Sequence, residues 1–445
     1  MIRAFFEGPA GSGKTHHMVG EAVSASDHVF ADPGQKLLAL TFMNGSRHRL
    51  NYRFRDVPQL RGRFVCLTFD SFAGMVVRRR RSLLRELPDA NHPPGLKEFD
   101  RICIDAARLL EVPAVAAWIA ASYPLVVVDE AQDLNPHRFR LLKALAETTC
   151  LIAAADEFQN LNEDVDARDV IVWLKGAETP NELTQIRRTS RDGLLQVADA
   201  LRNGADVCGR LQLKKAPPPS RKTWHQGPGV RLLEAPAKNP GLVSWTVANE
   251  LRMLGRNAVI VTPDARSEFV QDVLHAVQTK RFDLNKKEGT MFGPFTLSRQ
   301  RRDEEEAADI LGPFGDQNVI SLKVATECIS GQNHPACPHI CQRLERARNV
   351  KGETEFTRQR LDEIVGDVLR DIARHHPRAE SGRLVMTIHQ AKNREFQRVL
   401  VMWPHSATGS PEQLRRLLYN AVTRAKECCS IVVFGQGRTK KPPFS

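Results

Sequence analysis

The sequence contains no run of 18 or more apolar residues. A helix that crosses a membrane needs roughly 20 of them, so we expect no membrane span and no membrane partner. The nine cysteines are odd in number and lack the spacing of a disulfide framework, which favours a reducing, cytoplasmic location. An apolar, strand-like stretch begins at residue 2, so we expect no signal peptide before the fold.

Acidic residues are in short supply as well. The 52 Asp and Glu are outnumbered by 64 Lys and Arg, which gives a formal net charge of +12. A basic excess favours a polyanionic partner such as nucleic acid. Part of the excess is clustered at 78–81 (RRRR), although such a run also occurs on faces that simply contact water.

Strand-like and helical patterns alternate along the 445 residues. The length and a hydrophobic content of 42% suit a globular protein of roughly two to four domains, and no repeat at solenoid spacing is present. Apolar runs at 2–6, 36–42, 63–69, 125–128, 150–156, 257–263, 383–388, 398–403 and 429–435 predict strands. Helical patterns cover 72–122, 267–277, 354–375 and 411–427, and the proline-rich stretch 214–229 predicts a linker. We therefore expect two α/β halves, each with an inserted helical piece.

The first strand leads directly into GPAGSGKT at 8–15, which has the G-x-x-x-x-G-K-[ST] spacing of a phosphate-binding loop. Glycines let the backbone curl so that its N–H groups face phosphate oxygens, and a helix starting near Lys14 adds its positive end. We expect Lys14 to reach the β- and γ-phosphates of ATP and the Thr15 hydroxyl to hold Mg²⁺. The expected nucleotide-binding residues of this loop are Gly8, Pro9, Ala10, Gly11, Ser12, Gly13, Lys14 and Thr15.

An acidic pair follows another apolar strand in VVVDEAQD at 126–133. At the carboxyl end of a parallel strand, Asp129 would lie beside the phosphate-binding loop and bind Mg²⁺ through water. Glu130 would then act as the general base that activates the attacking water. Such a pair also occurs at ordinary helix N-termini, but the loop upstream favours the catalytic interpretation.

D-E-A-Q-D resembles the corresponding sequence of superfamily 1 helicases of the UvrD/Rep/PcrA type. Six further segments resemble motifs of that family and follow in the family's order: LTFMNGS (40–46), LTFDSFA (67–73), AADEFQ (154–159), LTQIRRTS (183–190), MTIHQAKNREF (386–396) and RRLLYNAVTRAK (415–426). The resemblance implies a DNA-stimulated ATPase motor that moves 3′ to 5′ along single-stranded DNA.

The resemblance also implies a role for individual residues. Gln159 would sense the γ-phosphate, Arg188 and Arg424 would be arginine fingers, and Glu395 would contact the ribose. Closure of the two halves would bring the arginines to the phosphate, and hydrolysis would release them. The residues expected to contact single-stranded or tailed duplex DNA are Phe42, Asn44, Thr68, Ser71, Thr387 and His389.

Two RecA-like parallel-sheet domains with reduced, mostly helical insertions are the implied architecture. The first domain would comprise 1–72 and 123–182, with a small insertion at 73–122. The second would comprise 183–284 and 383–445, with an insertion at 285–382.

The sequence departs from the family pattern in several places. Only seven residues precede Gly8, whereas the family usually has about twenty, with a glutamine that reads adenine, so specificity for adenine stays open. Asn162 and Asp164 replace aromatic residues that stack on bases, and Asp70 replaces a histidine. Asn393 and Arg394 replace the glycine and leucine of K-G-L-E-F. Fewer stacking rings predict weak, poorly processive unwinding by the chain alone.

A cluster of metal-binding residue types lies at 328–341: Cys328, His334, Cys337, His339 and Cys341. Thiolates and imidazoles can bind zinc. The spacing fits zinc motifs only loosely, so buried free thiols on a helix are the alternative interpretation.

Three functions remain open from the sequence. The leading one is an ATP-dependent single-stranded DNA translocase or helicase. The second is a DNA-stimulated ATPase subunit that regulates a partner such as a nuclease and unwinds little. Compact UvrD-like proteins occur beside nucleases in anti-phage systems such as Gabija, and the short chain is compatible with that. The third, a P-loop kinase or GTPase-like switch, conflicts with D-E-A-Q-D and with two arginine fingers.

Overall fold

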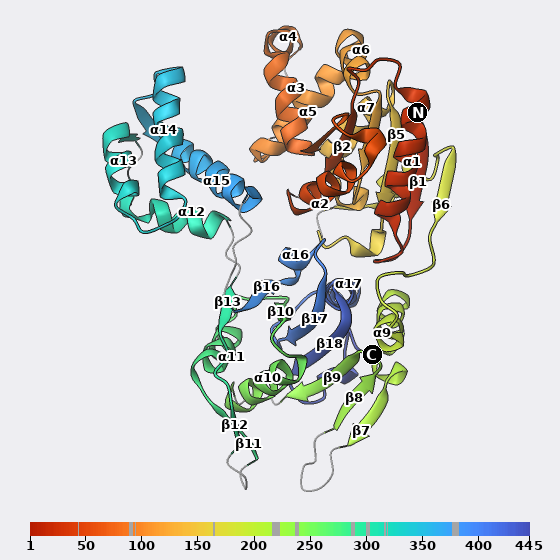
Figure 1. Ribbon diagram of the computed structural model, residues 1–445, viewed down its shortest axis with the longest axis vertical. Helices are drawn as coiled ribbons and strands as arrows, with labels where there is room; N and C mark the ends of the chain where they lie inside the picture. The colour runs from red at the N-terminus through yellow and green to blue at the C-terminus, as the bar shows by residue number, and fades with distance from the viewer. Residues whose placement is uncertain are drawn as a thin grey trace. The chain divides into compact units, whose positions relative to one another are not determined.

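A computed structural model describes most of the chain (Figure 1). The described residues are 1–42, 44–88, 92–93, 95–162, 165–215, 223–235, 240–285, 290–299, 303–315, 317, 319–375 and 382–445. They divide into two compact units, one formed by Met1–Phe295 with Met386–Ser445 and the other by Thr296–Val385. Within these ranges, no helix has both the length and the apolar character needed to cross a membrane.

The first unit contains a six-stranded sheet and most of an eight-stranded sheet, and all strands of the six-stranded sheet pair in parallel. Its order is β3-β2-β4-β5-β1-β6. The strands are β1 (Ile2–Glu7), β2 (Leu37–Thr41), β3 (Phe64–Thr68), β4 (Leu125–Val128), β5 (Cys150–Ala155) and β6 (Thr179–Glu182). The helices of this part are α1 (Lys14–Val29), α2 (Asn44–Arg55), α3 (Phe69–Arg79), α4 (Arg81–Glu86), α5 (Glu98–Leu110), α6 (Pro113–Ser122), α7 (Pro136–Ala146) and α8 (Arg168–Leu174).

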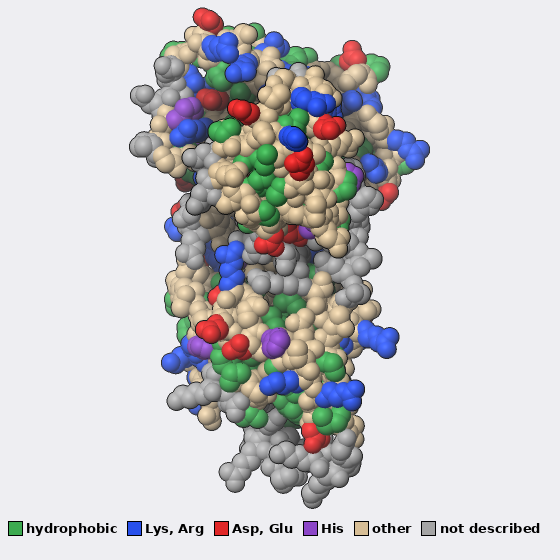
Figure 2. Space-filling view, turned by 90° about the vertical axis from the view of Figure 1, so that its left-hand side faces the viewer, with side chains coloured by type: hydrophobic (Ala, Val, Ile, Leu, Met, Phe, Trp, Pro, Cys, Tyr) green, Lys and Arg blue, Asp and Glu red, His purple; other side chains and the backbone are tan. Residues whose placement is uncertain are grey.

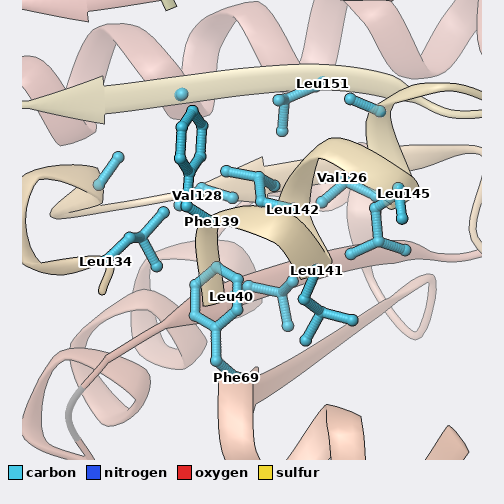
Figure 3. Packing of buried hydrophobic residues seen from close by; sticks show 14 of the residues in the cluster. Leu40, Phe69, Val126, Val128, Leu134, Phe139, Leu141, Leu142, Leu145 and Leu151 are labelled. Atoms are coloured by element: carbon cyan, nitrogen blue, oxygen red, sulfur yellow. The ribbon is translucent and has the colours of Figure 1, made fainter. Parts of the chain in front are cut away.

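Both faces of this sheet are buried, because alternate residues of each strand point to opposite sides. Leu38 and Leu40 of β2 pack in one core with residues of α3, α5, α6, α7 and α8, as Figure 3 shows for Leu40, Phe69 and the leucines of α7. Leu37 and Ala39 pack in the other core with residues of α1 and α2. The continuous apolar runs in the sequence therefore correspond to strands covered on both sides.

The second sheet has eight strands in the order β13-β16-β10-β17-β18-β9-β8-β7. Strands β10, β17, β18 and β9 pair in parallel, while β7 and β8 add an antiparallel edge. The strands are β7 (Gln212–Lys215), β8 (Thr223–Gly227), β9 (Val230–Ala235), β10 (Ala258–Thr262), β13 (Leu297–Arg299), β16 (Arg383–Thr387), β17 (Phe396–Trp403) and β18 (Ala425–Phe434). The associated elements are α9 (Asp192–Asn203), α10 (Pro240–Leu254), α11 (Glu268–Thr279), α16 (Ile388–Ala391), α17 (Pro411–Val422) and the hairpin β11 (Phe282–Asn285) with β12 (Thr290–Phe292).

The second unit is a small helical body. Its elements are α12 (Asp303–Leu311), β14 (Val319–Ser321), α13 (Leu322–Ser330), α14 (Cys337–Lys351), β15 (Glu355–Thr357) and α15 (Arg358–His375), and β14 pairs with β15 in an antiparallel ribbon. Its own apolar core is built from all four helices and from Phe356. The sequence predicts an insertion at 285–382, and the compact unit spans Thr296–Val385.

The α/β architecture with two sheets confirms the predicted fold class. Two local expectations are wrong. The predicted helix at 411–427 ends at Val422, because β18 starts at Ala425 and its residues complete the parallel sheet. The predicted linker at 214–229 contains β8, because its prolines, at 217–219 and at 228, lie on either side of this strand and leave Thr223–Gly227 free to pair with β7 and β9.

Candidate functional site

The phosphate-binding loop lies between β1 and α1, at the carboxyl edge of the first sheet. Gly11 and Gly13 adopt positive φ angles of 84° and 91°, which favour glycine. A Cβ atom on Gly11 would lie 2.6 Å from Cβ of Arg188, so a side chain at this position would clash. The loop is therefore shaped by its glycines, as the sequence predicts.

The side chains of Lys14 and Thr15 face into the loop. The Lys14 ammonium donates to the carbonyl oxygens of Gly8 and Pro9 at 2.7 and 3.1 Å. Burial lowers the pKa of Lys14. The Ser12 hydroxyl is buried and has no hydrogen-bond partner among the described residues, so the loop holds a polar atom ready for a further ligand.

The acidic pair follows β4 directly. The Thr15 hydroxyl donates to Asp129 Oδ2 at 3.1 Å, so the two groups expected to hold Mg²⁺ lie together. Glu130 has a left-handed backbone with φ of 60°, and its carboxylate accepts a hydrogen bond from the Gln132 amide at 2.7 Å. The turn after β4 thus orients both carboxylates toward the loop.

The surroundings shift the pKa values of Asp129 and Glu130 in opposite directions. Burial, together with the charge of Glu130, raises the pKa of Asp129. Burial alone would raise the pKa of Glu130 too, but the charges of Lys392, Lys14 and Arg49 outweigh it and leave that pKa below its ordinary value. Glu130 is therefore ionised at neutral pH, as a general base must be.

Gln159 ends a short 3₁₀ turn after β5, Glu157–Gln159. Its amide donates to Asp156 Oδ2 at 2.8 Å. Arg424 lies between α17 and β18, near the second sheet, and its guanidinium donates to Gln159 Oε1 at 3.1 Å. The Arg424 side chain is only 1% exposed. The predicted γ-phosphate sensor and one predicted arginine finger are thus in direct contact.

The second predicted finger, Arg188, also lies beside the loop. The segment that carries it contacts the phosphate-binding loop, because the Arg187 N–H donates to the Gly11 carbonyl at 2.7 Å. Arg188 donates to the Thr423 carbonyl at 2.9 Å and pairs with Glu395 at 2.9 Å.

Glu395, the predicted ribose contact, is bound by two cations. Besides Arg188, the Lys426 ammonium lies 2.9 Å from its carboxylate. Burial would raise the pKa of Glu395, but Arg188 and Lys426 outweigh it and lower the value to about 2. The Glu395 carboxylate therefore joins Arg188 to Lys426 at the start of β18.

The predicted DNA contacts come from two places. On the first sheet, the Phe42 ring is 37% exposed, the Thr68 hydroxyl caps α3 by accepting from the Ser71 N–H at 3.1 Å, and the side chain of Asn44 lies outside the described part of the chain. On the second sheet, Thr387 caps α16 through a capping box with Gln390, and His389 is exposed. Each set follows the carboxyl end of a parallel strand.

The residues that depart from the family pattern have local partners. Asp70 accepts a 2.7 Å hydrogen bond from Arg138, whose guanidinium also lies 5.2 Å from the centre of the Phe42 ring. Asn162 is exposed, and Asp164 lies outside the described residues. Asn393 has a positive φ of 63° and donates to the Ser46 hydroxyl at 2.8 Å.

The cysteine and histidine cluster belongs to the second unit. Cys337 is buried in its core, and burial raises the pKa of the Cys337 and Cys341 thiols. His334 lies 3.7 Å from the Glu306 carboxylate. No group of three or more His, Cys, Asp or Glu side chains among the described residues could hold a metal ion.

Several residues of the site were not predicted. Lys392 and Asp133, both at most 8% exposed, form an ion pair of 2.6 Å between the two motifs that contain them. The sequence signal that could have indicated them is their place within recognised segments, Lys392 in MTIHQAKNREF and Asp133 in DEAQD. Arg202 of α9 pairs with Asp156 at 2.8 Å, and Arg49 of α2 faces the acidic pair. No sequence motif marks these two arginines.

Comparisons with known proteins give two sequence matches and a structural likeness. Residues 82–161 match the family described as UvrD/REP helicase N-terminal domain, and residues 384–432 match the UvrD-like helicase C-terminal domain. A comparison with curated proteins returns no significant match.

Similar solved structures include helicases of the Pif1 type. Pif1 from Candida albicans is 12% identical with a TM-score of 0.40, and the match covers 97% of this chain and 91% of that one. Pif1 from Bacteroides, solved with ADP-AlF3 and single-stranded DNA, is 13% identical with a TM-score of 0.34, covering 97% and 88%. The N-terminal match includes the DEAQD segment and Gln159, and the C-terminal match includes Arg424. These two matched segments resemble domains of UvrD-like helicases and follow one another in the order of the family's motifs.

Proposed function

We propose that the chain is an ATP-driven motor that translocates 3′ to 5′ on single-stranded DNA and separates strands ahead of it. The observation that carries the proposal is the 3.1 Å contact between Gln159 of the first sheet and Arg424 near the second. It joins the nucleotide loop and acidic pair of one sheet to an arginine of the other, as ATP hydrolysis between two RecA-like domains requires.

The residues present suit Mg²⁺-ATP. Mg²⁺ prefers oxygen ligands, and the Thr15 hydroxyl and the Asp129 carboxylate supply them 3.1 Å apart. The unpartnered Ser12 hydroxyl lies in the same loop. Bound Mg²⁺ would neutralise charge on the phosphates. Lys14 would exchange its bonds to the loop carbonyls for bonds to phosphate oxygens.

Each remaining polar group then has a distinct part in hydrolysis. Glu130 accepts the proton of the attacking water, because it is ionised at neutral pH. Arg424 and Arg188 stabilise the negative charge that develops on the γ-phosphate. Gln159 hydrogen-bonds Arg424 and so reports the state of the phosphate to the second sheet.

Motion along DNA follows from these contacts. The bridge between the sheets includes the γ-phosphate only before hydrolysis, so each turnover biases the sheets between two arrangements. The residues expected to grip DNA lie on both sheets, with Phe42 and Ser71 on the first and Thr387 and His389 on the second. Alternating grip by the two sets would move the chain along the strand.

Strand displacement on duplexes with either a 3′ or a 5′ tail tests the proposal. ATP-dependent displacement of the 3′-tailed duplex, and little of the 5′-tailed one, is the expected result. DNA-stimulated ATP hydrolysis without displacement of either duplex would instead support the second function, in which the chain regulates a partner such as a nuclease. Absence of both ATP hydrolysis and displacement would contradict both functions.

The loss of aromatic residues near Gln159 predicts a weak hold on DNA. Asn162 is exposed, so a ring placed there would be accessible to a base. Stacking is worth about 1–3 kcal/mol per base, which corresponds to roughly 5- to 150-fold in Kd. Asn162→Tyr should therefore tighten binding of single-stranded DNA by at least about fivefold, as measured by fluorescence anisotropy. Asn162→Leu is the control without a ring, and an equal gain for Leu and Tyr would exclude stacking.

The arginine run at 78–81 offers a test of charge. Arg79 and Arg80 lie over the Trp118 ring, with 5.8 and 4.5 Å between guanidinium and ring centre, while Arg78 and Arg81 are exposed. Figure 2 shows that basic and acidic side chains are interspersed on the face it presents.

Replacement of Arg78 and Arg81 by Ala spares the contacts with Trp118. If both neutralise phosphates, the slope of log K against log salt for single-stranded DNA should become shallower by about 1.4, or about 0.7 per phosphate. An unchanged slope would show that these arginines contact only water and not DNA.

A further inference from the structure

Arg49 lies outside the predicted motifs, and its guanidinium places a positive charge beside the acidic pair. It lies in α2, the helix that follows the Phe42 segment, and its side chain is 25% exposed. One guanidinium nitrogen, Nη2, is 3.8 Å from Glu130 Oε1 and 4.0 Å from Asp129 Oδ2. These distances are those of ion pairs rather than of hydrogen bonds, so Arg49 holds both carboxylates by charge alone.

The other side of the same guanidinium is bonded to the segment 386–396. Arg49 Nη1 donates to the backbone carbonyl of Asn393 at 3.0 Å. The Asn393 amide in turn donates to the Ser46 hydroxyl of α2 at 2.8 Å, and both of these side chains are buried. Helix α2 is thus tied by two hydrogen bonds to a residue that lies four positions after His389, a predicted DNA contact.

Arg49 is incompletely bonded in this position. Its Nε atom is buried and has no hydrogen-bond partner among the described residues. A buried donor without a partner raises the free energy of the arrangement. This arrangement of Arg49 can therefore be exchanged for another more readily than a fully bonded one.

Binding of Mg²⁺ would make the present position of the Arg49 guanidinium less favourable, because both groups are positively charged. The Asp129 oxygen that lies 4.0 Å from Arg49 also accepts the Thr15 hydroxyl, the expected second metal ligand. A divalent cation near this oxygen repels a guanidinium about 4 Å away. Retention of Arg49 next to Glu130 in the nucleotide-loaded site then depends on its other bond, the one to Asn393.

We propose that Arg49 is a positioning residue that restrains Glu130 while DNA is absent and releases it when DNA binds at Thr387 and His389. A shift of residues 386–396 on DNA binding would break the bond to Asn393, and Arg49 would leave the acidic pair. Glu130 would then be free to turn toward the attacking water. The inference rests on the proposed DNA-stimulated ATPase and assigns its stimulation to one side chain.

Turnover of ATP by Arg49→Ala, without DNA and at saturating single-stranded DNA, tests the role. Loss of the restraint should raise the DNA-free kcat by at least about fivefold, the lower end of typical coupling between sites. The DNA-saturated kcat should change much less, so the stimulation ratio should fall. Arg49→Lys keeps the charge and should restore part of the ratio. Arg55→Ala removes an exposed arginine from the same helix and should leave the ratio unchanged.

Affinity for a fluorescent, non-hydrolysable ATP analogue shows whether each variant retains its site. Should Arg49→Ala fail to bind the analogue, Arg49→Gln, which keeps a long polar side chain, takes its place in the comparison. An unchanged ratio, or an equal loss of kcat with and without DNA, would overturn the role of Arg49. If DNA does not stimulate the unaltered chain, the proposed function itself fails, which separates the two outcomes.

Discussion

Glu130→Gln is expected to lower ATP turnover by about 10²- to 10⁴-fold, the usual contribution of a general base, while Mg²⁺-ATP still binds. The amide cannot accept the proton of water, but it keeps the size of the carboxylate and an oxygen that can accept from Gln132, now 2.7 Å away. Steady-state hydrolysis and binding of an ATP analogue together measure the effect.

Lys14→Ala is the matched comparison, because it removes the proposed phosphate ligand and should lose affinity as well as turnover. The contrast between the two variants separates chemistry from binding. Near-normal turnover by Glu130→Gln would exclude Glu130 as the base and would shift attention to other carboxylates of the site, such as Asp133.

Arg424→Ala should have the larger effect on turnover. An arginine finger typically contributes about 10³- to 10⁵-fold to kcat, and its charge acts mainly in the transition state, so nucleotide affinity should fall much less. Arg424 is buried and also donates to the Asn420 carbonyl at 2.9 Å. Its loss removes a donor from both that carbonyl and Gln159, so thermal unfolding must be measured beside kcat.

Arg424→Lys distinguishes catalysis from folding. Lysine keeps the charge and fills most of the space, but it cannot make the two-sided contact with Asn420 and Gln159. We expect Arg424→Lys to unfold near the temperature of the unaltered chain and still to lose most of its turnover. Full activity of Arg424→Lys would contradict a finger that acts through a planar guanidinium.

The nucleotide loop and the acidic pair could be predicted because each depends on local sequence. Gly11 and Gly13 adopt the positive φ angles that the loop requires, and the apolar run of β4 places Asp129 at a strand end. Parallel strands end at one edge of a sheet, so β1, β4 and β5 bring Lys14, Glu130 and Gln159 together although they are far apart in the sequence.

The contacts between distant segments could not be predicted in the same way. Arg49 meets Asn393 and Arg202 meets Asp156 through packing that no periodicity encodes. The helical pattern in the sequence continues past Val422, where α17 ends. The end of the helix could not be predicted, because propensity alone does not show where the pairing of β18 begins. Asp70, which departs from the family motif, forms an ion pair with Arg138, a partner on α7 that the sequence did not indicate.

ATP hydrolysis with and without single-stranded DNA tests the central claim most directly. The unaltered chain and Lys14→Ala should be compared at one salt concentration, because binding to DNA depends steeply on salt. We expect hydrolysis that is slow alone, rises severalfold with single-stranded DNA and is lost in Lys14→Ala. Hydrolysis at the same rate with and without DNA, or hydrolysis that survives Lys14→Ala, would contradict a DNA-driven motor at this site.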